Sequence, residues 1–249
     1  MKHQFHNEAT GTVEILDDRY YYSEKTEQYY ASVTTYLDAY PKGYGYTNWL
    51  KQVGFNADLI VKKAGEEGSL VHSLIEQYLL GNEITWYDKG IPKYDLHIWQ
   101  MLLKFVDFWT TYKPEIIAIE QKLVSDAYLV GGRLDLVCKF NQQTWLIDFK
   151  SSNALYRSHE LQTAAYCKMW EEINKNPIQR RGCLWLKSLT QGPDKTNKKI
   201  QGKGWQLVEP KNTYETDFNM FKKIMDIWHD SNTVNPSNLT LPNKLKLEK

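Results

Sequence analysis

The stretch GGRLDLVCKFNQQTWLIDFKSS, residues 131–152, decides the fold of this chain. Two apolar runs, LDLVCKF and TWLIDFK, stand on either side of the polar residues Asn141 and Gln142. Runs of this length, rich in β-branched and aromatic residues and separated by a short polar turn, are typical of a β-hairpin. Trp145-Leu146-Ile147 leaves no polar face in the middle of the second run, so we expect that strand to be buried on both sides.

Two aspartates and a lysine give this hairpin its chemistry. Side chains alternate along a strand, so Asp148 and Lys150 share one face, while Phe149 points to the other face, into the core. If the hairpin closes on Asn141-Gln142, Asp135 lies opposite Asp148, with Cβ atoms about 4.5–5.5 Å apart. Facing carboxylates repel each other unless a divalent cation binds both, and a neighbouring lysine can stabilise negative charge on a phosphate. The pattern favours phosphodiester hydrolysis, although a D-x-K triplet on a solvated sheet face has the same sequence.

The hairpin lies within an alternation of helical and extended segments, and from residue 95 to residue 188 the predicted order is α-β-β-β-α-β. The expected segments are a helix over 95–112, strands over 115–124, 129–140 and 144–151, a helix over 158–172 with Leu161, Ala165, Met169 and Ile173 on its buried stripe, and a strand over 181–189. A helix beginning at residue 57 precedes this core, and a returning strand at 204–210 and a C-terminal helix follow it. Gly131-Gly132, before the first aspartate, leaves room for a backbone to approach.

Composition and length limit the possible classes of protein. The chain has 249 residues, of which 42% are hydrophobic and 24% charged, as in ordinary globular proteins. A net charge of +1 means that any basic nucleic-acid footprint is local. No apolar run is long enough to span a membrane and the start lacks a signal-peptide core, so we expect a cytoplasmic protein with three reduced cysteines. We expect a single domain over 1–249, divided into a Tyr-rich extension (1–56), a core (57–188), a basic hairpin with the C-terminal helix (189–231) and a tail (232–249).

Nine of the 17 tyrosines lie between Tyr20 and Tyr46. They can complete a sheet and core, or they can offer stacking surfaces for unpaired bases. We favour the first interpretation.

The motifs GGRLDLV, LIDFKSS and LQTAAY resemble the P-D-(D/E)-x-K nuclease superfamily, in its RecB-type exonuclease branch. That branch carries G-x-x-D, D-x-K and a Q-x-x-x-Y helix in this order, after a G-x-x-x-H helix that Gly68 and His72 match here. The resemblance covers residues 64–188 and implies a restriction-endonuclease-like α/β core, with a mixed central sheet flanked by helices. Leu134 stands where the superfamily name has proline, a frequent substitution.

The resemblance also assigns roles to individual residues. It implies that His72, Asp135 and Asp148 are metal ligands, together with the backbone carbonyl of Phe149, and that Lys150 is the catalytic lysine.

Further residues are assigned outside this set. Gln162 and Tyr166, at i and i+4 of one helix, would face the active site and the DNA. Glu120, which resembles an acidic position in some members, and Glu76, which can orient the imidazole, are second-tier candidates.

These assignments predict a metal-dependent DNA exonuclease of recombination, repair or phage replication, in a bacterial or phage-infected cell. The expected cofactors are two Mg²⁺ or Mn²⁺ ions, and three cysteines are too few for an iron–sulfur cluster. No P-loop motif occurs, so the protein takes no nucleotide and any helicase partner is another polypeptide, as a strand-annealing partner would be. A structure-selective endonuclease and a non-catalytic DNA- or partner-binding module remain as alternatives. The expected phosphate clamp is a basic hairpin with Lys187, Lys195, Lys198, Lys199 and Lys203.

Overall fold

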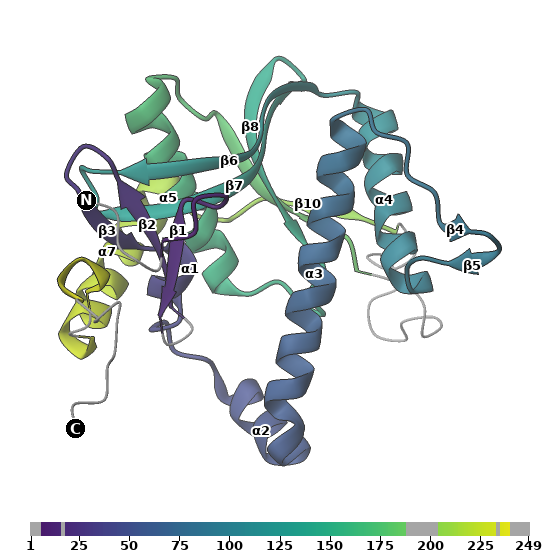
Figure 1. The fold of residues 1–249 in the computed structure, drawn as a ribbon. Coiled ribbons are helices and arrows are strands. Elements are labelled where there is room, and N and C mark those ends of the chain that lie inside the picture. Colours follow the sequence, from purple (N-terminus) through teal and green to yellow (C-terminus); the bar gives the residue numbers. More distant parts are fainter. Residues whose placement is uncertain (1–5, 16–17, 188–203, 233–234, 240–249) are drawn as a thin grey trace, which may run out of the picture.

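The predicted hairpin lies in a five-stranded sheet of strand order β10-β9-β8-β7-β6 (Figure 1). The computed structural model describes residues 6–15, 18–187, 204–232 and 235–239. Its strands are β6 (Glu115–Ser125), β7 (Val130–Phe140), β8 (Gln143–Lys150), β9 (Arg180–Trp185) and β10 (Gln206–Val208). All neighbours are antiparallel except β8 and β9, whose parallel pairing requires the crossover helix α5 (Arg157–Asn174). The mixed sheet and the α-β-β-β-α-β order are confirmed.

The β7–β8 hairpin closes on Asn141 and Gln142, as predicted. Both residues have positive φ, 50° and 61°, which is the conformation of a two-residue type I′ turn. The pairing runs from Phe140 opposite Gln143 to Leu136 opposite Ile147. One step further along this register, Asp135 and Asp148 come opposite each other. The turn chemistry thus fixes which residues meet at the far end of the hairpin.

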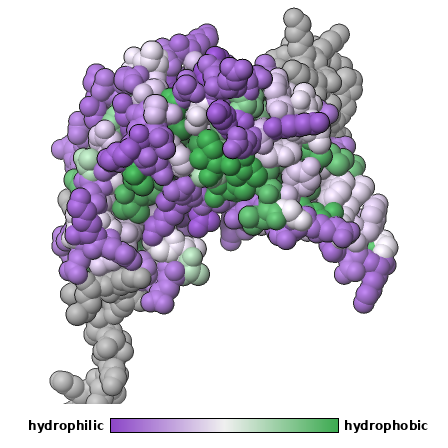
Figure 2. All heavy atoms as spheres, turned by 90° about the horizontal axis from the view of Figure 1, so that it is seen from above, coloured by the Kyte–Doolittle hydropathy of each residue, from purple (hydrophilic) through white to green (hydrophobic). Residues whose placement is uncertain are grey.

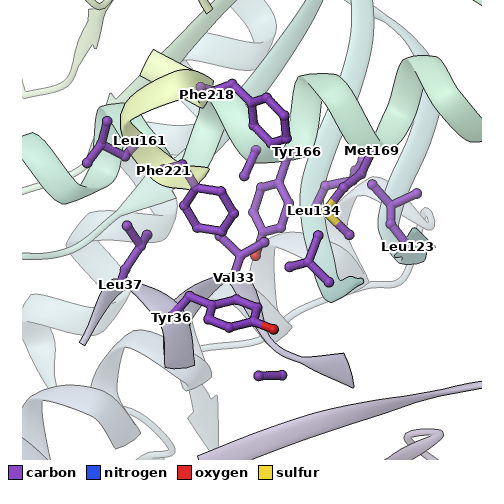
Figure 3. Close-up of a cluster of buried hydrophobic side chains, with 14 of the residues drawn as sticks. Val33, Tyr36, Leu37, Leu123, Leu134, Leu161, Tyr166, Met169, Phe218 and Phe221 are labelled. Carbon is purple, nitrogen blue, oxygen red and sulfur yellow. The ribbon is translucent and has the colours of Figure 1, made fainter. Parts of the chain in front are cut away.

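Two hydrophobic clusters cover the two faces of the sheet. On one face, helices α3 (Ala57–Leu79) and α4 (Leu96–Tyr112) enclose a cluster that includes Phe105, Phe108 and Phe149. The other face carries a cluster built around Tyr36, Leu134 and Phe221 (Figure 3). The elements that form it are α5, α7 (Tyr214–Ser231), α1 (Val33–Leu37) and a second sheet of β1 (Thr12–Ile15), β2 (Asp18–Ser23) and β3 (Gln28–Ala31).

The tyrosine-rich segment belongs mainly to the core. Six of its tyrosines are buried in β2, β3 and α1, and they are Tyr20, Tyr21, Tyr22, Tyr29, Tyr30 and Tyr36. Tyr44 and Tyr46 are exposed instead, in helix α2 (Tyr44–Val53). A 3₁₀ turn, η1 (Gly54–Asn56), joins α2 to α3. The core interpretation therefore holds for most of the segment and fails at its C-terminal end.

The remaining elements are small. A hairpin of β4 (Tyr87–Asp88) and β5 (Ile91–Pro92) links α3 to α4, and a 3₁₀ turn, η2 (Pro236–Asn238), follows α7. In the view from above, hydrophilic residues cover most of the surface, and hydrophobic ones gather near its centre (Figure 2). Within the described ranges, every helix is too short or too polar to cross a lipid bilayer.

One detail of the sequence-based prediction is wrong. Ile173 is 41% exposed, because three successive four-residue steps along α5 rotate a side chain by about 120° away from Leu161. The backbone of Ser32 approaches Gly131 in a parallel β-bridge, as expected, and the missing side chains of both glycines also make room for aromatic rings. A Cβ on Gly131 would lie 2.3 Å from the Cβ of Tyr21, and one on Gly132 would lie 2.5 Å from the ring of Tyr166.

Candidate metal centre

Three carboxylates lie in one row across three neighbouring strands. The pairs Ile119–Leu136 and Gln121–Leu134 place Glu120 of β6 opposite Asp135 of β7. The hairpin register places Asp148 of β8 on the other side of Asp135. Asp135 and Asp148 are 7% and 1% exposed, so this row lies inside the protein.

The strands are irregular at this row. Glu120 has a φ of 45° in the middle of a strand, a conformation that costs a non-glycine residue about 1–3 kcal/mol. Leu134 and Leu136 pack into opposite hydrophobic clusters, although residues two apart normally share a face. Ile119 and Leu123 of β6 also belong to opposite clusters. Strands β6 and β7 therefore change the face of the sheet to which their side chains point at Glu120 and Asp135, a feature that the alternation in the sequence does not show.

Helix α3 brings His72 to this row. Its Nδ1 lies 3.3 Å from Asp135 Oδ1 and 3.7 Å from Glu120 Oε1, while its Nε2 lies 3.1 Å from the carbonyl oxygen of Phe149. One ligand atom each from His72, Glu120 and Asp135 lies within 4.8 Å of the others. Glu120, expected only as a second-tier candidate, is therefore closer to the imidazole than the sequence suggested.

Asp148 faces a different partner. Its Oδ2 lies 2.8 Å from the ammonium nitrogen of Lys150. Lys150 Nζ also donates a hydrogen bond to Gln162 Oε1 at 2.9 Å. Gln162 on α5 thus holds the lysine head group from the opposite side, a contact between elements that the sequence could not specify.

The charges in this cluster shift one another's pKa values. Burial alone would lower the pKa of His72, but Asp135 and Glu120 outweigh it and raise the pKa to about 10. Burial raises the pKa of Asp148 to about 6, against the opposing effect of Lys150. Burial would also raise the pKa of Asp135, but His72 and Lys150 lower it below its ordinary value. The imidazole and the lysine are therefore held as cations by the carboxylates.

The donor set fits a divalent cation. Oxygen and imidazole ligands of this kind suit Mg²⁺ and Mn²⁺. Glu120 Oε1 is buried and has no hydrogen-bond partner among the residues that the structure describes, and burial together with the charge of Asp135 raises the pKa of Glu120. An unpaired buried carboxylate oxygen is costly, and an ion coordinated there would remove that cost. Asp135 is already oriented, because its Oδ2 accepts a hydrogen bond from the Phe149 N–H at 2.6 Å.

Tyr166 contributes from the core. It is 4% exposed, and its ring belongs to the cluster shown in Figure 3. Tyr166 also lines the cleft, together with Gln162, the residue that holds Lys150. Both residues therefore face the site, as expected from the sequence, and their contact with DNA stays a prediction.

Two acids of the row, Glu120 and Asp135, line a cleft of about 1070 Å³, whereas Asp148 is not among its lining residues. Glu120, Asp135 and Lys150 line its floor, and Glu76 lines it one turn beyond His72. One wall is the face of α3 that carries Ala64, Gly65, Gly68, Ser69, His72 and Ser73. The opposite wall comes from the N-terminal sheet and β7 and includes Thr12, Arg19, Tyr21 and Arg133. Figure 1 shows the ribbons of α3 and β1, the elements that carry these two sets of lining residues. The small side chains of the α3 wall keep the cleft open beside the carboxylates.

The predicted basic hairpin is described only in part. β9 and β10 pair in antiparallel fashion, as expected. Lys187 Nζ lies 3.4 Å from the carbonyl oxygen of Asn153, outside the residues that line the cleft. Lys195, Lys198, Lys199 and Lys203 fall outside the described residues.

Comparison with known proteins identifies the superfamily to which the chain belongs. The sequence profile of the PD-(D/E)XK nuclease superfamily matches residues 48–230. The chain belongs to this superfamily of nucleases, whose members use divalent metals and act on nucleic acids. A crystal structure named "putative exonuclease", from Eubacterium rectale, superposes with a TM-score of 0.41 at 12% identity, over 74% of this chain and 77% of that one. No functionally curated protein matches the chain.

Proposed function

We propose that this chain is a divalent-metal-dependent exonuclease acting on DNA. The observation that carries the proposal is the group of His72, Glu120 and Asp135, whose ligand atoms lie within 4.8 Å of one another in an open cleft, with Lys150 in the same cleft and paired with the buried Asp148. This donor set suits a divalent cation, and the cleft gives a polymer access to it. The motif resemblance to the RecB-type branch favours removal of nucleotides from an end.

The metal ligands in this proposal are His72, Glu120, Asp135 and Asp148, with the Phe149 carbonyl. The carbonyl oxygen of Phe149 lies 3.1 Å from His72 Nε2, whereas Asp135 and Glu120 lie beside Nδ1 of the same ring. Two ions, Mg²⁺ or Mn²⁺, are the proposed arrangement, and an imidazole ligand suits Mn²⁺.

The bound ion would polarise the scissile phosphate and lower the pKa of the attacking water. Lys150 has a different task. Burial would lower its pKa, but Asp148 and Asp135 outweigh this and raise it, so the ammonium group keeps its charge. It faces the cleft at a point fixed by Asp148 and Gln162, where it can stabilise the negative charge that develops on the phosphate. Gln162 orients the lysine, and Tyr166, which lines the cleft beside it, would face the DNA.

The wider setting is part of the same proposal. The enzyme would act as a single domain in recombination, repair or phage replication, in the cytoplasm, with a separate helicase or strand-annealing protein as its partner. Lys187 and the other lysines of the basic hairpin would contact phosphates.

The test uses linear and circular DNA, single- and double-stranded, with a label at one end. Each substrate is incubated with Mn²⁺, Mg²⁺ or EDTA, and Asp148→Asn serves as the inactive control. We expect metal-dependent release of nucleotides from one end of linear DNA, and intact circles.

Two results would replace the proposal. Cleavage of circles would identify an endonuclease with the same core. Intact DNA under every metal, with binding retained, would identify a module that grips DNA without cutting it.

A further inference from the structure

One part of the molecule exposes its apolar side chains. We call residues 42–63, which comprise α2, η1 and the first turns of α3, the arm. It projects below the rest of the molecule in Figure 1, and α2 contains no buried residue. Its exposed large hydrophobic side chains are Tyr44 (79%), Tyr46 (38%), Leu50 (36%), Phe55 (106%), Leu59 (68%), Ile60 (44%) and Val61 (52%).

This exposure is unusual for helices of a globular protein. An amphipathic helix normally buries its apolar stripe against a neighbour. A contiguous exposed apolar patch marks an interaction site. The exposed apolar patch of the arm therefore indicates a binding site, and the residues around the patch indicate which kind of molecule binds there.

The arm is positively charged. It carries Lys42, Lys51, Lys62 and Lys63 against one acid, Asp58, whereas the whole chain has 31 basic and 30 acidic residues. Lys42 and Lys63 lie near Asp38 and Glu67 at 3.5 and 3.8 Å, in exposed pairs that contribute little. Within the described part of the chain, Lys51 and Lys62 have no ion-pair partner. Basic residues interleaved with aromatic rings are the chemistry that binds single-stranded nucleic acid.

The arm continues the wall of the cleft. The cleft-lining residues of α3 recur from Ala64 to Ser73, about 14 Å of one helix face. Ile60 and Val61 lie four residues before Ala64 and Gly65, so they extend the same face towards the arm. A nucleic-acid strand whose sugar–phosphate backbone lies over Asp135 can therefore follow α3 directly onto the arm.

We propose that the arm binds unpaired bases of the nucleic-acid strand that occupies the cleft, by stacking on Tyr44 and Phe55 while Lys51 and Lys62 face its phosphates. This inference rests on the proposed function, and it specifies a single-stranded segment as the part of the substrate that the enzyme holds. A second copy of the chain is the less favoured occupant, because a symmetric contact would bring two lysine-rich arms together.

The test measures binding without cleavage. The full-length protein is titrated in EDTA with a labelled single-stranded oligonucleotide that contains 2-aminopurine, whose fluorescence falls when it stacks. Tyr44→Ala and Phe55→Ala should each weaken binding about 5- to 150-fold, the range for loss of one stacked base, and reduce the quenching. Both side chains are exposed, so removing them takes nothing from the core, and circular dichroism checks the fold.

Tyr87→Ala is the matched control. Tyr87 is a 52% exposed aromatic residue on the β4–β5 hairpin, outside the arm and the cleft. Its removal should leave binding and quenching unchanged, and blunt duplex DNA should bind the wild type and Phe55→Ala alike.

Three outcomes would overturn the inference. If the arm variants bind the oligonucleotide with the affinity of the wild type, its bases do not stack on Tyr44 and Phe55. Equal losses in Tyr87→Ala would show a non-specific effect. A concentration-dependent dimer that Phe55→Ala abolishes, with unchanged DNA binding, would assign the arm to a second copy. Because binding is read in EDTA, a protein that binds single strands through the arm but never cleaves DNA would refute the proposed function alone.

Discussion

At the scale of single residues, the position of Lys150 explains how its charge is used. Its ammonium group lies between Asp148 Oδ2 and Gln162 Oε1, at 2.8 and 2.9 Å. A lysine held from two sides loses little freedom when a phosphate arrives, so its charge is preorganised. Gln162 has no charge of its own and acts by keeping the ammonium group in place.

Substitution of the lysine tests this role. Lys150→Ala should lower the cleavage rate about 10²–10³-fold, because a preorganised positive charge is lost. Gln162→Ala should lower it less, because the lysine remains. Single-turnover cleavage with saturating Mn²⁺ measures both, with thermal unfolding as the control. A Lys150→Ala variant that does not fold would give the lysine a structural role instead.

The pKa values in the metal centre predict how metal binding depends on pH. His72, with its pKa raised to about 10, must lose a proton before its nitrogen can bind an ion. Below pH 6 the carboxyl group of Asp148, whose pKa is raised to about 6, is protonated as well, and it must also lose its proton before it binds an ion. Affinity for Mn²⁺ should therefore rise about tenfold per pH unit between pH 7 and 9, and more steeply below pH 6. Calorimetry in buffers of different ionisation enthalpy counts the released protons. His72→Ala should bind Mn²⁺ more weakly with a flat profile above pH 7, and a flat wild-type profile would contradict the assignment.

At the scale of elements, the distance between α5 and β7 depends on one glycine. A Cβ on Gly132 would lie 2.5 Å from Cε1 of Tyr166, and that ring is confined in the core. Gly132→Ala should lower the free energy of unfolding by about 1–3 kcal/mol, as overpacking does.

Chemical denaturation measures this effect. Gly65→Ala is the matched control, since nothing lies within 4 Å of a Cβ there and alanine favours a helix by about 0.5–1 kcal/mol. Gly132→Ala combined with Tyr166→Leu should recover part of the loss. No recovery would mean that the ring is not what the new methyl group meets.

A buried ionic network joins β9, α5 and α7. Asp217 is fully buried, its Oδ2 lies 2.5 Å from Arg181 Nη2, and its Oδ1 is bonded to Arg157 and, at 3.0 Å, to Asn212. Arg157 thus joins α5 to α7 through Asp217. Asp217→Ala should cost about 3–5 kcal/mol, because it leaves Arg181 buried without its partner.

The exposed acid Glu215 on the same helix gives the control, and Glu215→Ala should cost less than about 1 kcal/mol. Burial would raise the pKa of Asp217, but Arg157 and Arg181 outweigh this and lower it. The stability it contributes is therefore present above its ordinary pKa of 3.8 and is lost as pH falls below that value. Equal losses in both variants would argue against a buried pair.

At the scale of the whole molecule, the central sheet connects both hydrophobic clusters, and the candidate metal centre lies where β6 and β7 change the face to which their side chains point. We expect a single cooperative unfolding transition in calorimetry, because neither cluster is complete without the sheet. Mn²⁺ at 100 times its dissociation constant should add about 2.7 kcal/mol to the stability. His72→Ala should abolish most of this gain, and two separate transitions would contradict the single-domain organisation.

The sequence alone determined the hairpin, its register and the helices that flank it. These features depend on local chemistry: the two-residue turn at Asn141-Gln142, the alternation of side chains and the 3.6-residue period. The same local rules placed Asp148 and Lys150 together, and the motif resemblance added His72 and Gln162.

Only the tertiary structure decided the rest. Glu120 comes opposite Asp135 at a residue with left-handed backbone, where β6 and β7 change the face to which their side chains point. Gly132 receives the ring of Tyr166, and Arg157 binds Asp217, through contacts between residues far apart in the chain. The arm stays exposed because no other element of the described chain covers it. Local patterns specify which residues can meet, but the packing of distant segments decides which of them do, because burial is a property of the whole fold.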